Sequence, residues 1–294
     1  MDIGKLGDNH TAREGETGSF PTLDGIRLYE QWWRPAREPK AGIVLLHGLA
    51  EHSGRHHSLA HYLTRNGYAV DTFDLRGHGK SNGMPIYLRS FDEYLGDLDL
   101  FLDRVKARLP GKPLFVMGFS MGGTIAVLYV LTRNPQLRGV VLSAPVVRIS
   151  DSVSPVLQKF SAWIAALFPG LRTVKINHRH LSRDLEVTEA YDCDPLVFRK
   201  GILARTGAEL IKATQRIQAQ VERFDLPVLI LQGSEDRLSD PGATQWFSQA
   251  VASADRTLNL YPGLYHEVMN EPEKDRIRED VIGWLDAHVR VDDR

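Results

Sequence analysis

Three residues of this 294-residue chain have the types and the order that nucleophilic catalysis requires. Ser120 lies in the pentapeptide Gly-Phe-Ser-Met-Gly at 118–122, and Asp236 and His266 each follow a later apolar run of strand length. A serine hydroxyl is a weak nucleophile until a base removes its proton, and that base must be oriented by a third group. We therefore predict Ser120 as the nucleophile, His266 as the general base and Asp236 as the acid that orients it.

Each of these assignments has a competing interpretation. Gly-x-Ser-x-Gly also describes a glycine-rich turn with a helix-capping serine, Asp236 also suits a helix cap with Glu235 as the rival acid, and His266 also suits an ordinary loop. The order serine, acid, histidine favours catalysis, because open α/β sheets with a nucleophile at a strand-to-helix turn use that order.

The same chemistry needs two N–H groups that receive the oxyanion of a tetrahedral intermediate. The N–H of Met121 directly follows the proposed nucleophile. The N–H of Leu49 follows His47-Gly48, where an upstream apolar run ends. We predict these two as the oxyanion hole; the competing interpretation of the second is an ordinary glycine turn.

A cluster of histidines precedes the serine, namely His52, His56, His57 and His61. His57 and His61 are four residues apart and could supply half of a metal site on a helix. No cysteine joins them and no carboxylate completes a known ligand spacing. We predict a solvated helix face, no metal and no cofactor.

The elements that must position these residues are visible as alternating patterns. Continuous apolar runs at 41–46, 68–74, 113–117, 139–143 and 227–232 predict buried strands, and the sequence between several of them has helical spacing. Ser90 and Glu93 have the spacing of a capping box, which would open one of those helices. We predict the α/β class, with a mostly parallel central sheet flanked by helices.

The alternation stops at Ala144-Pro145 and resumes near residue 221. Between them, residues 146–220 have a helical pattern interrupted by prolines, and we interpret this segment as a helical cap (lid) inserted in the core. The predicted divisions are a flexible N-terminal tail at 1–18, a core formed by 19–145 and 221–294, and the cap.

Composition places the chain among ordinary globular proteins. Apolar residues make up 43% and charged residues 25%, with 36 basic and 37 acidic side chains, so no nucleic-acid surface is expected. The single cysteine, Cys193, excludes an internal disulfide. Residues 1–18 lack the apolar region of a signal peptide, and no apolar run has the length of a membrane span. We expect a cytoplasmic protein.

Six stretches together resemble one family, the monoglyceride lipases of the α/β-hydrolases, and in particular its bacterial, mycobacterial-type members. The likeness runs in order from about residue 20 to 288. Its most specific parts are the stretch that begins at His47 and the stretch Tyr191–Leu196 in the predicted cap. The six stretches are His47–Arg55, Asp74–Ser81, Gly118–Gly123, Tyr191–Leu196, Gly233–Leu238 and Tyr261–Glu267.

This resemblance implies an α/β-hydrolase fold and cleavage of monoacylglycerols to a fatty acid and glycerol. It implies that the glycerol end lies near Glu51, Arg55 and Tyr191 and that the acyl chain lies in an apolar tunnel under the cap. A lysophospholipase or a broad short- or medium-chain carboxylesterase would use the same machinery. Independently, Glu51 and Arg55 are four residues apart, and the competing interpretation is a plain surface ion pair.

The cap stretch 156–168 is apolar around much of a helix. One interpretation is packing onto the core. The other is a tunnel wall with a lip that makes peripheral contact with a membrane, as a lipid substrate would require. On the second interpretation, the side chains that face the acyl chain are Leu157, Phe160, Ile164 and Leu167.

Overall fold

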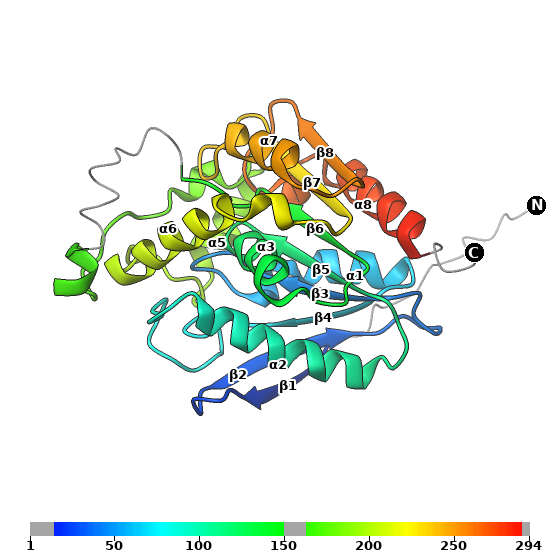
Figure 1. The fold of residues 1–294 in the computed structure, drawn as a ribbon, viewed down its shortest axis with the longest axis horizontal. Helices are drawn as coiled ribbons and strands as arrows, with labels where there is room; N and C mark the ends of the chain where they lie inside the picture. The colour runs from blue at the N-terminus through cyan, green and yellow to red at the C-terminus, as the bar shows by residue number, and fades with distance from the viewer. Residues whose placement is uncertain (1–14, 150–162, 290–294) are drawn as a thin grey trace, which may run out of the picture.

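The computed structural model describes residues 15–149 and 163–289 (Figure 1). Its described strands form one eight-stranded sheet in the order β1-β2-β4-β3-β5-β6-β7-β8. The strands are β1 Glu16–Pro21, β2 Arg27–Trp33, β3 Gly42–Leu46, β4 Ala69–Phe73, β5 Leu114–Phe119, β6 Gly139–Ser143, β7 Val228–Gly233 and β8 Arg256–Tyr261.

Most of this sheet is parallel. From β4 to β8 every neighbouring pair is parallel, whereas β2 is antiparallel to both β1 and β4. Every residue of β3, β5, β6 and β7 is buried, which explains why these strands have continuous apolar sequences. The predicted α/β class and mostly parallel sheet are confirmed.

Helices cover both faces of the sheet. Helices α1 and α8 pack on one face of the sheet, and α2, α3 and α7 pack on the other face. None of the helices in the described part is long and apolar enough to cross a membrane. The helices are α1 His57–Arg65, α2 Asp92–Arg108, α3 Met121–Arg133, α5 Leu185–Cys193, α6 Ala204–Gln218, α7 Pro241–Ala250 and α8 Lys274–Val289.

The parallel strands bring distant parts of the sequence to one edge. His47 follows β3, Ser120 follows β5, Asp236 lies just beyond β7 and His266 lies just beyond β8. Because parallel strands end at the same edge of a sheet, residues as far apart in the sequence as His47 and His266 can meet there.

Two local predictions differ from the structure. β1 begins at Glu16, so residues 16–18 pair with β2 and the predicted tail extends too far. The predicted capping box does not form. Glu93 accepts a hydrogen bond from the backbone N–H of Arg89, and the Ser90 hydroxyl accepts one from the backbone N–H of Asp92. Both side chains still bind free N–H groups near the start of α2, but each contact is displaced by one residue.

Of the segment predicted as the cap, residues 146–149 and 163–220 are described. Its helices α5 and α6 lie between β6 and β7 in the sequence and gather at one end of the sheet, on the left in Figure 1. The second half of α6 joins the main core through Ala213 and Ile217, while Ala204 and Ala208 in its first half pack against Ala165. α6 therefore fastens the segment to the core at one end.

Candidate active site

Ser120 occupies a strained turn between β5 and α3. Its φ of +51° and ψ of −116° are rare for a residue with a side chain. A Cβ on Gly118 would lie 2.5 Å from the carbonyl oxygen of Gly122, and a Cβ on Gly122 would lie 2.2 Å from that of Leu46. Only glycine fits on both sides, which explains the Gly-x-Ser-x-Gly spacing in physical terms.

Asp236 and His266 are joined by a hydrogen bond of 2.8 Å from Nδ1 of the imidazole to Oδ2 of the carboxylate. Asp236 also accepts from the side chains of Gln232 and Ser239 and from the N–H of Leu238, so its orientation is fixed. Glu235 is exposed and has no such contact with the histidine. The structure therefore brings Asp236, and not Glu235, to His266.

The surroundings of this pair favour an ionised Asp236 carboxylate and a more basic His266 imidazole. Burial opposes ionisation of Asp236, but the nearby His266 and the bound donors lower the pKa of the carboxyl. Burial alone would lower the pKa of His266, but the Asp236 carboxylate outweighs it and raises that pKa. An imidazole held this way has its second nitrogen available for a proton from elsewhere.

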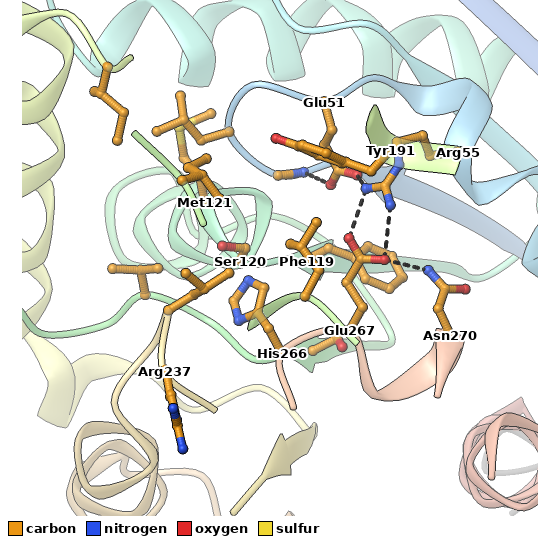
Figure 2. Close-up of a pocket in the computed structure, with 18 of the residues that line it drawn as sticks. Glu51, Arg55, Phe119, Ser120, Met121, Tyr191, Arg237, His266, Glu267 and Asn270 are labelled. Carbon is orange, nitrogen blue, oxygen red and sulfur yellow. Dashed lines mark hydrogen bonds and ion pairs between the residues drawn. The ribbon is translucent and has the colours of Figure 1, made fainter. Parts of the chain in front are cut away.

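Ser120 and His266 line the same cavity, and Figure 2 shows the imidazole facing the serine. The cavity has a volume of about 330 Å³. Leu49 and Met121 line it as well, and within the described residues neither of their backbone N–H groups has an acceptor. The four groups are thus arranged around one space in which an ester carbonyl could sit.

The loop that carries Leu49 is held by its own side chains. Glu51 accepts a hydrogen bond of 2.5 Å from the N–H of Gly48. His47 Nδ1 donates to the carbonyl of Gly48 at 2.7 Å, and its Nε2 accepts from the N–H of Leu75 at 2.9 Å. Burial lowers the pKa of His47 to about 3, which keeps this ring neutral and able to make both bonds.

Glu51, Arg55 and Tyr191 lie together beside the cavity, but not as a surface ion pair (Figure 2). The side chains of Arg55 and Glu51 are only 10% and 9% exposed and are 2.5 Å apart. Arg55 also binds Glu267 through two hydrogen bonds of 2.8 and 3.1 Å, and its guanidinium lies 4.9 Å from the centre of the Tyr191 ring. The surface interpretation is therefore wrong.

Glu267 was not among the residues predicted for the site. Its position directly after His266 was the only signal in the sequence, and Asn270 donates to it at 2.8 Å. Although burial opposes ionisation of Glu51, His56 and Arg55 hold the pKa of that carboxyl well below its usual range. One arginine thus holds two carboxylates at the polar end of the cavity.

Most of the remaining cavity wall is apolar, although Lys175 and Arg237 also line it, and its apolar side chains lie outside the predicted stretch 156–168. Leu167 is 69% exposed, and Ile164 packs against the small residues of α6 instead of facing the cavity. Leu157 and Phe160 lie outside the described residues. The apolar side chains that do line the cavity include Val146, Val174, Ile176, Ile202, Leu210 and Met269.

A buried carboxylate beneath the histidine loop connects that loop with the cap. Glu271 is 0% exposed and accepts 2.9 Å hydrogen bonds from the N–H of Tyr265 and from Nε of Arg183. The N–H of Glu267 also donates to the carbonyl of Leu181 in the cap at 2.7 Å. The backbone on both sides of His266 is therefore bonded to groups that contact the cap.

The predicted histidine cluster is divided among different partners. His57 and His61 contact each other through their Nε2 atoms at 2.8 Å, and His52 binds Asp194 of the cap at 2.7 Å. His56 lies 3.4 Å from Glu51. Across residues 15–149 and 163–289, no group of three or more metal-ligating side chains occurs.

Comparison with known proteins adds three findings. The family described as serine aminopeptidase, S33, matches residues 37–273. A monoacylglycerol lipase of Mycolicibacterium smegmatis is 35% identical over 92% of this chain and 97% of its own length, and the monoglyceride lipase of Mus musculus is 33% identical over 90% and 89%. The crystal structure of the Paleococcus ferrophilus monoacylglycerol lipase superposes with a TM-score of 0.78 at 27% identity, covering 94% of this chain and all of that one.

Proposed function

Because this chain belongs to the serine aminopeptidase S33 family and has the α/β-hydrolase fold, we propose that it is a serine hydrolase that cleaves monoacylglycerols to a fatty acid and glycerol. The observation that carries the proposal is the cavity beside Ser120. It has His266, held by Asp236, on one side, a charged polar end and a largely apolar remainder.

The proposed reaction proceeds in two steps. His266 accepts the proton of Ser120 as the serine oxygen bonds to the ester carbon, and the N–H groups of Leu49 and Met121 receive the oxyanion. The imidazolium then returns the proton to the departing glycerol oxygen, leaving an acyl-enzyme. Water repeats the sequence through the same base, releasing the fatty acid and restoring Ser120.

The polar end supports a glyceryl ester as the substrate. A monoacylglycerol has a small diol and one long chain, so it needs hydrogen-bonding groups at one end of a site and a dry wall at the other. Glu51, Arg55 and Glu267 supply acceptors and donors that are fixed by one another. The relatives that are named monoacylglycerol and monoglyceride lipases support the same substrate class.

The family description raises aminopeptidase activity as an alternative. An aminopeptidase must bind a free α-ammonium group, which calls for an unpaired carboxylate near the nucleophile. In the described part of the cavity lining, both carboxylates, Glu51 and Glu267, are bonded to Arg55. This favours an uncharged ester over a peptide amine.

Membrane contact through the cap forms part of the proposal. Five large apolar side chains between residues 163 and 174 are at least half exposed, which is unusual for a short surface segment. They are Trp163, Leu167, Phe168, Leu171 and Val174. Such a surface suits an enzyme whose substrate lies in a bilayer. The cytoplasmic location stays a prediction from the sequence.

The test is a hydrolysis panel with one acyl chain and varied leaving groups. We expect kcat/KM for 1-monooleoylglycerol to exceed that for methyl oleate by at least about tenfold, because only the glyceryl ester uses the polar end. Leucine p-nitroanilide, an aminopeptidase substrate, should not be cleaved. Equal rates on both oleoyl esters would support a broad carboxylesterase instead.

A further inference from the structure

A second cavity lies against the first, under the cap. Its volume is about 250 Å³, and four residues line both cavities, Lys175, Ile176, Tyr191 and Ile202. Ser120 lines only the first cavity. Because Tyr191 also stacks on Arg55 at the polar end, the second cavity adjoins the place where the glycerol is proposed to lie.

The charges lining the second cavity are unbalanced. Lys175 and Arg199 line it, and neither has a carboxylate partner in the part of the chain that the structure describes. Asp192 is the carboxylate in that lining, and its Oδ2 lies 3.1 Å from Nε2 of His178. The lining therefore has two cations and one carboxylate, and both cations belong to exposed residues.

Arg199 is also held in place. Its Nη1 donates to the carbonyl oxygens of Tyr191 and Asp194, at 2.9 and 2.7 Å, at the carboxyl end of α5. The remaining guanidinium N–H groups have no partner among the described residues. A guanidinium fixed by one edge presents its other edge as a preformed donor, the arrangement that binds phosphate well.

We propose that this second cavity, which we name the phosphate pocket, binds a phosphate carried on the glycerol of the substrate. The enzyme then also hydrolyses lysophospholipids of the monoacylglycerol phosphate type. The acyl ester lies at Ser120, the glycerol at the Glu51–Arg55 end, and the phosphate beyond Tyr191 with Lys175 and Arg199. The inference rests on the proposed function, because it extends the same acyl and glycerol positions.

The chemical step is unchanged by this extension. Ser120 attacks the same acyl carbon, the glycerol oxygen leaves with the proton from His266, and the products are a fatty acid and glycerol phosphate. The phosphate ester bond is not broken. The pocket contributes binding of the leaving group and no new reaction.

The test compares 1-oleoylglycerol with 1-oleoyl lysophosphatidic acid in mixed micelles that all contain the same excess of an anionic detergent. This keeps the surface charge equal for both substrates. We expect the wild-type enzyme to hydrolyse both, with kcat/KM values within about tenfold. Lys175→Gln and Arg199→Gln should each lower the lysophosphatidic acid value about tenfold, the usual effect of losing one charged hydrogen bond. In Arg199→Gln, whose side chain lines only the second cavity, the 1-oleoylglycerol value should change less than threefold.

Lys200→Gln is the matched control, because Lys200 is exposed like its neighbour Arg199 but does not line the pocket. A second measurement avoids micelles: sn-glycerol 3-phosphate should inhibit the hydrolysis of p-nitrophenyl butyrate competitively in the wild type, and the double variant should lose this inhibition.

Three results would overturn the inference. The first is no lysophosphatidic acid hydrolysis by an enzyme that cleaves 1-oleoylglycerol, which leaves the proposed function intact. The second is an equal fall of both substrates in Arg199→Gln, and the third is a fall of lysophosphatidic acid hydrolysis in Lys200→Gln as large as in Arg199→Gln. An enzyme that cleaves neither oleoyl substrate would refute the proposed function as well.

Discussion

At the scale of single residues, Ser120 is the side chain on which the whole proposal depends. Ser120→Ala removes one oxygen and leaves the strained turn, whose shape is set by the neighbouring glycines. We expect kcat to fall roughly 10⁴-fold, as when one member of a catalytic triad is lost. A fluorophosphonate should label the wild type once per chain, on the peptide that contains Ser120. A label on another serine would contradict the assignment.

Asp236 and Glu235 offer a matched pair of neighbouring acids. Asp236→Asn should keep the fold but disturb the tautomer of His266, and we expect a loss of about 10⁴-fold in kcat, the size known for the equivalent change in a serine protease. Glu235→Gln should cost less than about threefold, since Glu235 is exposed and does not contact the imidazole. Similar losses in both variants would rule out Asp236 as the sole orienting acid.

The raised pKa of His266 makes a prediction about pH. The base must be neutral to accept a proton, so kcat/KM on a water-soluble ester should fall as pH drops through this pKa. Since Asp236 raises the pKa, the midpoint should lie above the ordinary histidine value of about 6.5. In Asp236→Asn burial remains and the carboxylate is gone, so the midpoint of the residual activity should move to lower pH. An unchanged midpoint would mean that another group controls the profile.

Some of these residues could be found from the sequence, and others could not. Ser120, Asp236 and His266 each follow a strand, and the order of such positions is readable along the chain. The ion pair of Arg55 with Glu267 joins residues 212 positions apart, and no local pattern carries that information. A four-residue spacing suggested only the Glu51 partner, and it could not show that the pair is buried.

At the scale of elements, the acyl wall includes Leu210 of α6 and, from the chain before α6, Val174, Ile176 and Ile202. Leu210 of α6 lines the cavity, whereas Leu167 is exposed outside it. Leu210→Trp should fill part of the cavity and exclude the end of a long chain. Each excluded methylene costs about 0.8 kcal/mol, or roughly fourfold in kcat/KM. The ratio of oleoyl to butyryl ester hydrolysis should therefore fall at least tenfold.

Leu167→Trp is the control for that experiment, and its ratio should stay within about twofold of the wild type. The opposite outcome, with Leu167→Trp selective and Leu210→Trp neutral, would restore the prediction made from the apolar stretch 156–168. Thermal melts of both variants exclude unfolding as the cause.

The difference between predicted and observed elements has a physical origin. Buried parallel strands are continuous apolar runs, so β3, β5, β6 and β7 can be predicted one by one. A cap segment has two possible apolar partners, the core and the ligand, and periodicity alone does not distinguish them. Residues 174–176 belong to neither a helix nor a strand, yet Val174 and Ile176 line the cavity.

At the scale of the whole molecule, the buried Glu271 joins the histidine loop to the cap, and we expect it to couple movement of the cap to the position of His266. Its carboxylate holds the N–H beside His266 and the Arg183 side chain of the cap at once. Coupling free energies are reciprocal. If the cap moves away from Glu271, the position of His266 should become less fixed. If His266 is engaged with an acyl group on Ser120, the cap should in turn be bound more firmly.

Glu271→Gln tests this coupling. We expect kcat on a soluble short-chain ester to fall about tenfold and, in the same variant, proteolysis within residues 146–220 to become faster. Glu273→Gln is the control, because Glu273 also binds Arg183 but has no contact with the Tyr265 N–H. Because the Glu271 contacts with Arg183 and Tyr265 remain in this variant, cap proteolysis and kcat should both stay within about threefold of the wild type. If Glu271→Gln loses activity while cap proteolysis is unchanged, the cap and His266 are not coupled through Glu271.

The same linkage sets the sequence of events within one turnover. While Ser120 carries the acyl group, the cap should open more rarely than in the free enzyme, and hydrolysis should restore its mobility. The cap would then respond to whether Ser120 is acylated. It would enclose the acyl chain until water has attacked the acyl-enzyme and would release the fatty acid afterwards. Wild-type protein blocked by a long-chain phosphonate should accordingly resist proteolysis in the cap longer than the free enzyme does.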